Sequence, residues 1–130
     1  MILTLKTADM TCHLGLIDAD GQQLDHELWE SGRQLSDGLL TQIEALIKKQ
    51  QKTVANLTGI IVYEGPGSFT SLRIGLTVAN TTAYAQNIPI VGATGDEWIR
   101  DGLDKLKSAK PGDYVMPVYG AEANITKPKK

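Results

Sequence analysis

The chain has 130 residues, of which 42% are hydrophobic and 22% are charged, and its formal net charge is −2 at pH 7. This composition is typical of one globular domain, and the charge argues against binding nucleic acid by whole-chain electrostatics. The single cysteine, Cys12, excludes an internal disulfide and is typical of a reducing compartment. Residues 1–5 are too short for a signal peptide, and no apolar run could span a bilayer, so we expect a cytoplasmic protein.

The first thirty residues predict three strands in an antiparallel meander. Residues 1–7 are mostly apolar, and residues 12–18 alternate loosely between apolar and polar positions. The Asp20-Gly21 pair then favours a two-residue turn of type I′, and residues 23–29 return as the third strand.

A first helix is expected over residues 34–51. Its apolar positions recur at helical spacing and form one stripe, widened by Leu40: Leu35, Leu39, Ile43, Leu46 and Ile47. Gly38 inside this helix costs about 1 kcal/mol of helix propensity relative to alanine. Either a close contact at Gly38 or an ordinary surface position explains it.

The most informative stretch runs from residue 58 to residue 87. Residues 60–63 are apolar and β-branched, as in a buried parallel strand. Residues 64–67 then break the strand, because Gly65 and Gly67 around Pro66 favour a tight turn. Ser68 is a suitable N-cap for a helix over residues 69–87. Strand, turn and helix together predict half of a βαβ unit.

This second helix carries only one charge, Arg73, in 19 residues. Small residues recur every four positions and predict a ridge that another backbone can approach closely: Ser71, Gly75, Ala79 and Ala83. Apolar residues flank the ridge: Leu72, Ile74, Leu76 and Val78. The ridge is buried within its own domain, or it faces a partner helix. We favour the partner, because so short a chain has few elements to bury both faces of the helix.

The remaining residues predict a short strand over 89–92, a helix over 93–106 and a last strand over 114–119. The sequence therefore predicts one α/β domain over residues 1–121, with a mixed sheet of five or six strands. Residues 122–130 are expected to form a basic C-terminal tail.

The glycine turn and the start of the second helix carry a family resemblance. The segment Gly65-Pro66-Gly67-Ser68-Phe69-Thr70-Ser71-Leu72-Arg73-Ile74-Gly75 resembles the signature GPGSFTGLRIG of the bacterial YeaZ/TsaB family, with ten of eleven positions matching and Ser71 in place of glycine. That family belongs to the machinery that installs threonylcarbamoyl on adenosine 37 of tRNAs reading ANN codons. The resemblance covers residues 2 to about 121.

The resemblance implies one lobe of the actin/Hsp70/sugar-kinase fold, which is ribonuclease H-like. Typical members have a second lobe, and residues 116–121 resemble the strand that opens it. In the family that strand usually ends in Asp-Ala-Arg, and here Gly120 and Glu122 replace the Asp and Arg. The sequence thus resembles a single-lobe version of the family.

The resemblance also implies a non-catalytic subunit that binds and activates the catalytic subunit TsaD through its first two helices, with the ATPase TsaE docking on the pair. Contact with tRNA would then be indirect. The predicted partner-interface residues are Leu39, Ile43, Phe69, Ser71, Leu72, Gly75, Leu76, Ala79 and Ala83. The predicted motif-loop residues are Gly65, Pro66, Gly67, Ser68, Thr70 and Arg73.

No catalytic, cofactor-binding or metal-binding residue is predicted. The glycine turn lacks the Gly-Lys-Ser/Thr ending of a P-loop, so a turn that shapes the helix entry is favoured over a phosphate site. Lys6-Thr7-Ala8 stands where the family usually has Asp-Thr-Ser, so the carboxylate that could hold a hydrated Mg²⁺ is missing. We therefore expect no independent nucleotide hydrolysis.

The sequence also argues against a metal site at the two histidines and against a reactive cysteine. His13 and His26 are expected on one face of the hairpin, but two ligands are too few for a zinc site, and Cys12 is interpreted as a buried apolar residue. In the tail, a solubilising role is favoured over phosphate contacts for Lys127, Lys129 and Lys130. Two further functions remain open: a homodimeric scaffold and, less favoured, an acyl or peptide hydrolase.

Overall fold

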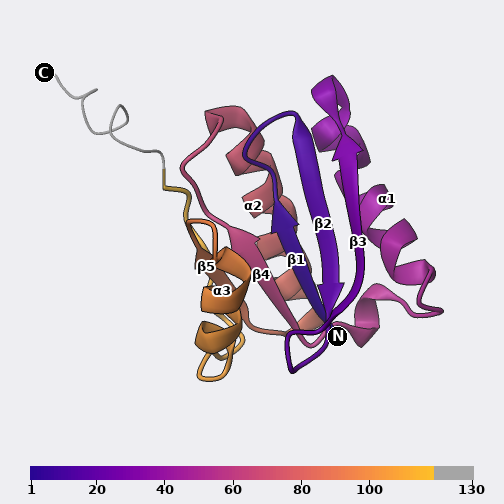
Figure 1. The fold of residues 1–130 in the computed structure, drawn as a ribbon, viewed down its shortest axis with the longest axis vertical. Coiled ribbons are helices and arrows are strands. Elements are labelled where there is room, and N and C mark those ends of the chain that lie inside the picture. The colour runs from indigo at the N-terminus through magenta and orange to yellow at the C-terminus, as the bar shows by residue number, and fades with distance from the viewer. Residues whose placement is uncertain (119–130) are drawn as a thin grey trace, which may run out of the picture.

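A five-stranded mixed sheet forms the centre of the fold in the computed structural model, which describes residues 1–118 (Figure 1). The strands lie in the order β3-β2-β1-β4-β5. Strands β1, β2 and β3 are antiparallel neighbours, whereas β4 and β5 run parallel to β1. Their bounds are Ile2–Lys6 (β1), Thr11–Ile17 (β2), Gln23–Glu30 (β3), Gly59–Tyr63 (β4) and Ile90–Ala93 (β5). This sheet confirms the predicted α/β class.

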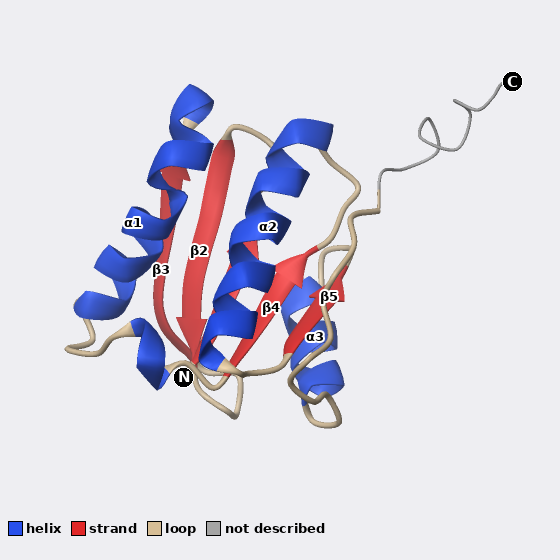
Figure 2. Ribbon diagram, turned by 180° about the vertical axis from the view of Figure 1, so that it is seen from behind, coloured by secondary structure: helices blue, strands red, loops and turns tan. Residues whose placement is uncertain are grey.

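Helices cover the two faces of the sheet unequally. Helices α1 (Leu35–Lys48) and α2 (Phe69–Gln86) lie side by side on one face (Figure 2). Helix α3 (Trp98–Leu106) lies on the other face, against β4 and β5 (Figure 1). Short 3₁₀ turns precede α1 at Gly32–Gln34 and follow it at Val54–Asn56. Among the described helices, none is both long enough and apolar enough to cross a bilayer.

The main core lies between the sheet and helices α1 and α2. Alternate residues of β1 and β2 turn the same way because side chains alternate along a strand. The core-facing set is fully buried: Leu3, Leu5, Cys12, Leu14 and Leu16. The predicted stripe of α1 meets this set, and its five residues are all buried: Leu35, Leu39, Ile43, Leu46 and Ile47. Leu40 does not widen the stripe, because its side chain is 47% exposed.

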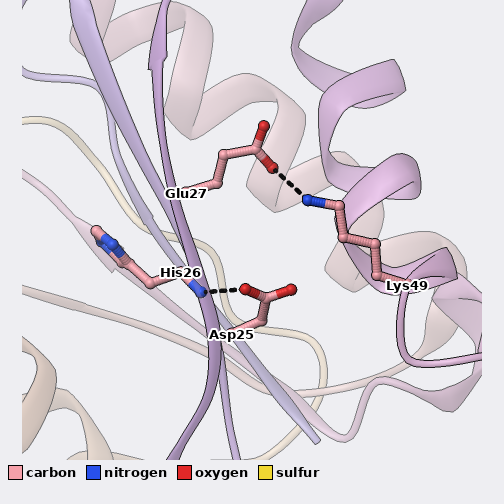
Figure 3. A network of polar contacts seen from close by, with 4 residues as sticks. All are labelled: Asp25, His26, Glu27 and Lys49. Carbon is pink, nitrogen blue, oxygen red and sulfur yellow. Dashed lines mark hydrogen bonds and ion pairs between the residues drawn. The ribbon is translucent and has the colours of Figure 1, made fainter.

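Helix α1 ends at Lys48, three residues before the predicted end, because the chain turns out of the helix there. Gln51 has a left-handed φ of 59°. Along α1, Gly38 makes a close contact, since an added Cβ would lie 2.9 Å from the Trp29 ring of β3. The Lys49 ammonium lies 3.6 Å from the Glu27 carboxylate, while His26 points to the other side of β3 (Figure 3). Packing of Trp29 on α1 matters more than this exposed ion pair, which contributes little.

The turn between β2 and β3 differs from the predicted type I′ turn. That type needs positive φ at both central residues, yet only Gly21 has it, at 89°. The Asp18 carboxylate instead accepts hydrogen bonds from the backbone N–H groups of Asp20 and Gln22, both at 2.9 Å. These local hydrogen bonds from the backbone to a side chain stabilise a different turn from the predicted two-residue turn. Beyond it, Gly15 pairs with His26, which places His13 and His26 on one face of the hairpin, as predicted.

The expected last strand is not formed over residues 114–118, which have no regular secondary structure. Both backbone groups of Val115 bond to the Asn80 side chain of α2, each at 2.9 Å. The Val118 N–H donates to the Glu64 carbonyl at 2.6 Å. Residues 113–118, called here the 113–118 segment, are therefore tied to α2 and the end of β4 rather than to the edge of β5. Tyr119 and the predicted tail lie outside the described residues.

Helix α3 begins at Trp98 rather than at residue 93. Ala93 still pairs with Tyr63 in the sheet, and the chain turns at Gly95, where φ is +83°. Of the residues predicted as the start of this helix, Ala93 therefore belongs to the sheet, and residues 94–97 form the turn before α3.

Candidate functional site

The glycine turn connects the end of β4 to the start of α2 and leaves no room for side chains. Gly65 has a φ of +127°, and an added Cβ would overlap the Val118 carbonyl oxygen. At Gly67 an added Cβ would lie 2.8 Å from the Ala8 side chain. Both glycines are therefore required by close approach of the chain, and Gly65 also by its backbone conformation. A side chain at Gly67 would therefore obstruct the helix entry.

The turn is fastened to the connection between β1 and β2. The Ser68 N–H donates to the Ala8 carbonyl at 2.7 Å. The Thr7 hydroxyl donates to the Ser71 carbonyl at 2.8 Å, and Gly75 packs directly on Thr7. Ser68 also caps α2, since its hydroxyl accepts from the Ser71 N–H at 3.5 Å. The first two turns of α2 are thus held against the carboxyl end of β1.

The small-residue ridge of α2 lies in the chain's own core. Gly75, Ala79 and Ala83 are buried, because small side chains let α2 approach its own sheet closely. The structure therefore does not place these predicted interface residues where a partner can reach them, and the same holds for four more: Leu39, Ile43, Leu72 and Leu76. Of the predicted set, only Phe69 and Ser71 keep exposed surface, with Phe69 54% exposed.

The remaining motif-loop residues are exposed. The Pro66 carbonyl accepts the Tyr63 hydroxyl at 2.8 Å. Thr70 and Arg73 are exposed on the first turns of α2, and the Arg73 guanidinium lies 5.2 Å from the centre of the Phe69 ring.

The glycine turn does not fit a phosphate, and its surroundings do not fit a hydrated metal ion. Residues 7–8 fill the space in front of the helix entry, and the Ser68 N–H is already bonded to them. At the end of β1, the Lys6 ammonium lies over the Tyr63 ring, 4.4 Å from its centre. A cation in this position repels a divalent metal. Burial, with the nearby Asp96 carboxylate, raises the pKa of the Tyr63 hydroxyl, so it stays a neutral hydrogen-bond donor.

The two histidines lie on the same face of the sheet as α3, over strands that α3 does not cover. Their ring centres lie 5.8 Å apart, as expected for diagonal neighbours across β2 and β3. Burial, together with Lys6 and His26, lowers the pKa of His13, while Asp9 opposes this shift. Among residues 1–118, no third histidine, cysteine, aspartate or glutamate joins them in a group that could hold a metal ion.

Cys12 is poorly suited to nucleophilic catalysis. Burial raises the pKa of its thiol to about 12, so the reactive thiolate is not formed at neutral pH. His13 follows it in sequence but projects from the opposite face of β2, because successive strand residues alternate. The pair therefore cannot act as nucleophile and base.

The accessible side of the helix pair lies opposite the ridge. The positions 73, 77, 81 and 84 share one side of α2 at helical spacing, and Tyr84 there is 88% exposed. On α1, Gly38 lies on the flank that contacts β3. Leu40, two residues later, lies on the opposite flank and therefore projects toward α2. We call this surface the outer helix face: Leu40, Arg73, Ile74, Thr77, Thr81 and Tyr84. In the sequence, the signal of this face is the scarcity of charge in α2.

Comparison with known proteins agrees with this architecture. The family model described as "TsaD: tRNA N6-adenosine threonylcarbamoyltransferase" matches residues 30–97, about half of the chain. A tRNA N6-adenosine threonylcarbamoyltransferase of Bdellovibrio bacteriovorus is 29% identical over 129 residues, covering 90% of this chain and 36% of that protein. The tRNA threonylcarbamoyladenosine biosynthesis protein TsaB of Bacillus subtilis is 29% identical over 125 residues, covering 91% of this chain and 54% of TsaB.

Among solved structures, YeaZ from Pseudomonas aeruginosa superposes with a TM-score of 0.64 at 25% identity, covering 72% of this chain and 43% of YeaZ. The chain thus spans between about a third and about half of these relatives. The fold is that of an actin-like, ribonuclease H-like α/β lobe. The chain belongs to the threonylcarbamoyltransferase family that the matching model describes, as a member of the TsaB/YeaZ type.

Proposed function

We propose that this chain takes part in forming N6-threonylcarbamoyladenosine at position 37 of tRNA, as a non-catalytic subunit. In this role it binds a TsaD-like catalytic subunit through α1 and α2 and holds that subunit in an active state. A TsaE-like ATPase docks on the resulting pair, and contact with tRNA is indirect. The relatives named for this modification support the assignment.

The observation that carries the proposal is the outer helix face. Helix α2 has 18 residues and a single charge, yet only one side of it is buried in the chain's own core. A solvent-facing helix side normally carries many charged residues. Here that side has a single charge, Arg73, and otherwise presents threonines, the half-buried Ile74 and the exposed ring of Tyr84. Depletion of charge with exposed aromatic residues is typical of the central part of a protein interface.

The chemistry of the described residues supports a non-catalytic role. The thiol of Cys12 is protonated, the histidine pair lacks a third ligand within residues 1–118, and Lys6 occupies the end of β1. These features also weigh against the acyl or peptide hydrolase. The homodimeric scaffold is the remaining alternative, because the outer helix face could pair with itself around a two-fold axis.

The test measures the affinity of the full chain for the TsaD-like protein of the same cell by calorimetry, with Leu40→Glu and Tyr84→Asp as interface variants. Each should weaken binding by about ten- to a hundred-fold, since central interface residues contribute about 1–3 kcal/mol. Leu28→Glu is the matched control, because Leu28 is 57% exposed against 47% for Leu40 but projects from the open face of the sheet.

The same variants should lower threonylcarbamoyl transfer to tRNA in a reconstituted reaction in proportion to the loss of binding. No binding of the wild-type chain to the TsaD-like protein would overturn the proposal. Dimerisation of the free chain that is lost in Leu40→Glu, without partner binding, would support the homodimeric scaffold instead.

A further inference from the structure

A second surface continues the outer helix face beyond α2. A hollow of about 310 Å³ lies between α2 and the 113–118 segment. Its α2 wall includes Arg73 and Thr77 of the outer helix face, and its opposite wall includes Tyr114 and Met116. A protein that covers the outer helix face therefore also meets the mouth of this hollow.

The walls of the hollow suit an apolar side chain. Leu76 and Val115 are buried at its base, whereas Met116 is 64% exposed and Tyr114 is 70% exposed. The volume equals about ten water molecules at roughly 30 Å³ each, enough for one large side chain. Buried apolar walls surrounded by more polar, exposed groups are typical of the pockets that receive interface anchors.

The hollow is preformed rather than dependent on a partner. Asn80 bonds to both backbone groups of Val115 at 2.9 Å, and Val118 bonds to the Glu64 carbonyl at 2.6 Å. Two separate anchors hold the 113–118 segment on either side of Met116. A preformed pocket reduces the ordering cost on binding.

The charge at the mouth indicates what accompanies the apolar side chain. Arg73 is the one charged residue of α2, it is exposed, and no acidic residue lines the hollow. The guanidinium forms well-directed pairs with carboxylates. The partner segment that fits here therefore carries an acidic residue next to its apolar one.

We propose that the hollow between α2 and the 113–118 segment receives a large apolar side chain of the TsaD-like partner, flanked by a carboxylate that pairs with Arg73. This inference rests on the proposed function, because it names a second contact of the same partner. It adds the 113–118 segment to an interface that otherwise consists of helices.

The test uses the full chain and the TsaD-like protein, with Met116→Ala as the variant. Met116 lies on the 113–118 segment, outside the outer helix face, so its removal tests the hollow separately. Binding should weaken about ten-fold, which corresponds to about 1.4 kcal/mol. Met10→Ala is the matched control, because Met10 is 66% exposed and lies in the connection between β1 and β2. Both variants should melt at the wild-type temperature.

The carboxylate is tested by the salt dependence of binding. Between about 0.05 and 0.5 M NaCl, affinity of the wild type should fall several-fold, because added salt screens exposed ion pairs. Arg73→Gln should bind more weakly at low salt and respond less to added salt. Equal salt dependence in the two proteins would overturn the pairing with Arg73.

The outcomes separate this inference from the proposed function. If the wild type binds the partner and Met116→Ala binds as tightly as Met10→Ala, the hollow is not an anchor site, while the proposed function stands. If Met116→Ala alters self-association of the free chain but not partner binding, the hollow receives a second copy and the inference is overturned. If the wild type does not bind at all, both proposals fail.

Discussion

Both sides of helix α2 are poor in charged residues, but they lie in opposite environments. The inner side carries Gly75, Ala79 and Ala83 and is buried against the chain's own sheet. The outer side carries Thr77, Thr81 and Tyr84 and is exposed. Scarcity of charge therefore has two causes in one helix: burial on the inner side and, under our proposal, a partner on the outer side. Composition alone does not separate them.

The largest expected effect is on the inner side, with Gly75→Leu. An added Cβ already overlaps the Thr7 hydroxyl, and a leucine would push α2 from the end of β1. Overpacking typically costs about 1–3 kcal/mol, and the lost bond from Thr7 to Ser71 adds about 1 kcal/mol. The melting temperature should fall by roughly 10 °C or more. Thr77→Leu, two residues further on the outer side, is the control and should melt normally. Equal melting of both variants would contradict the assignment of the two sides.

An intermediate effect is expected at the border between the two sides, with Asn80→Ala. The change removes both hydrogen bonds to Val115 and releases the 113–118 segment from α2. Stability should fall by about 1–2 kcal/mol. Hydrogen exchange should show faster exchange of the Val115 amide, with the amides of β1 and β4 little changed. Protection of Val115 that survives the substitution would mean that another contact holds the segment.

The smallest effect is expected on the outer side, with Tyr84→Ala in the isolated chain. Tyr84 is 88% exposed, and alanine has the higher helix propensity, so stability should be unchanged or rise by about 0.5 kcal/mol. Chemical denaturation of the isolated chain measures this. A loss above about 1 kcal/mol would show that Tyr84 supports the fold, and its use as an interface probe would then be invalid.

The local pattern of the sequence determined most of the fold. Short apolar runs and loose alternation located the strands, and helical spacing located the core stripe of α1, because burial imposes those patterns. The signature around Gly65 and Gly67 located the turn into α2, since these glycines avoid contacts that any side chain would make. The pairing of Gly15 with His26 agrees with the register of a two-residue turn, although the actual turn differs and the register shifts between Leu16 and Ile17.

The tertiary structure decided which side of α2 is buried and what residues 114–118 do. The small-residue ridge is compatible with any close neighbour, and only the fold shows that Gly75 packs on the side chain of Thr7, just after β1. The 113–118 segment has a strand-like pattern, but the Asn80 side chain satisfies Val115 in place of a neighbouring strand. Both outcomes depend on contacts between residues far apart in the chain, and such contacts leave no periodic signal in the sequence.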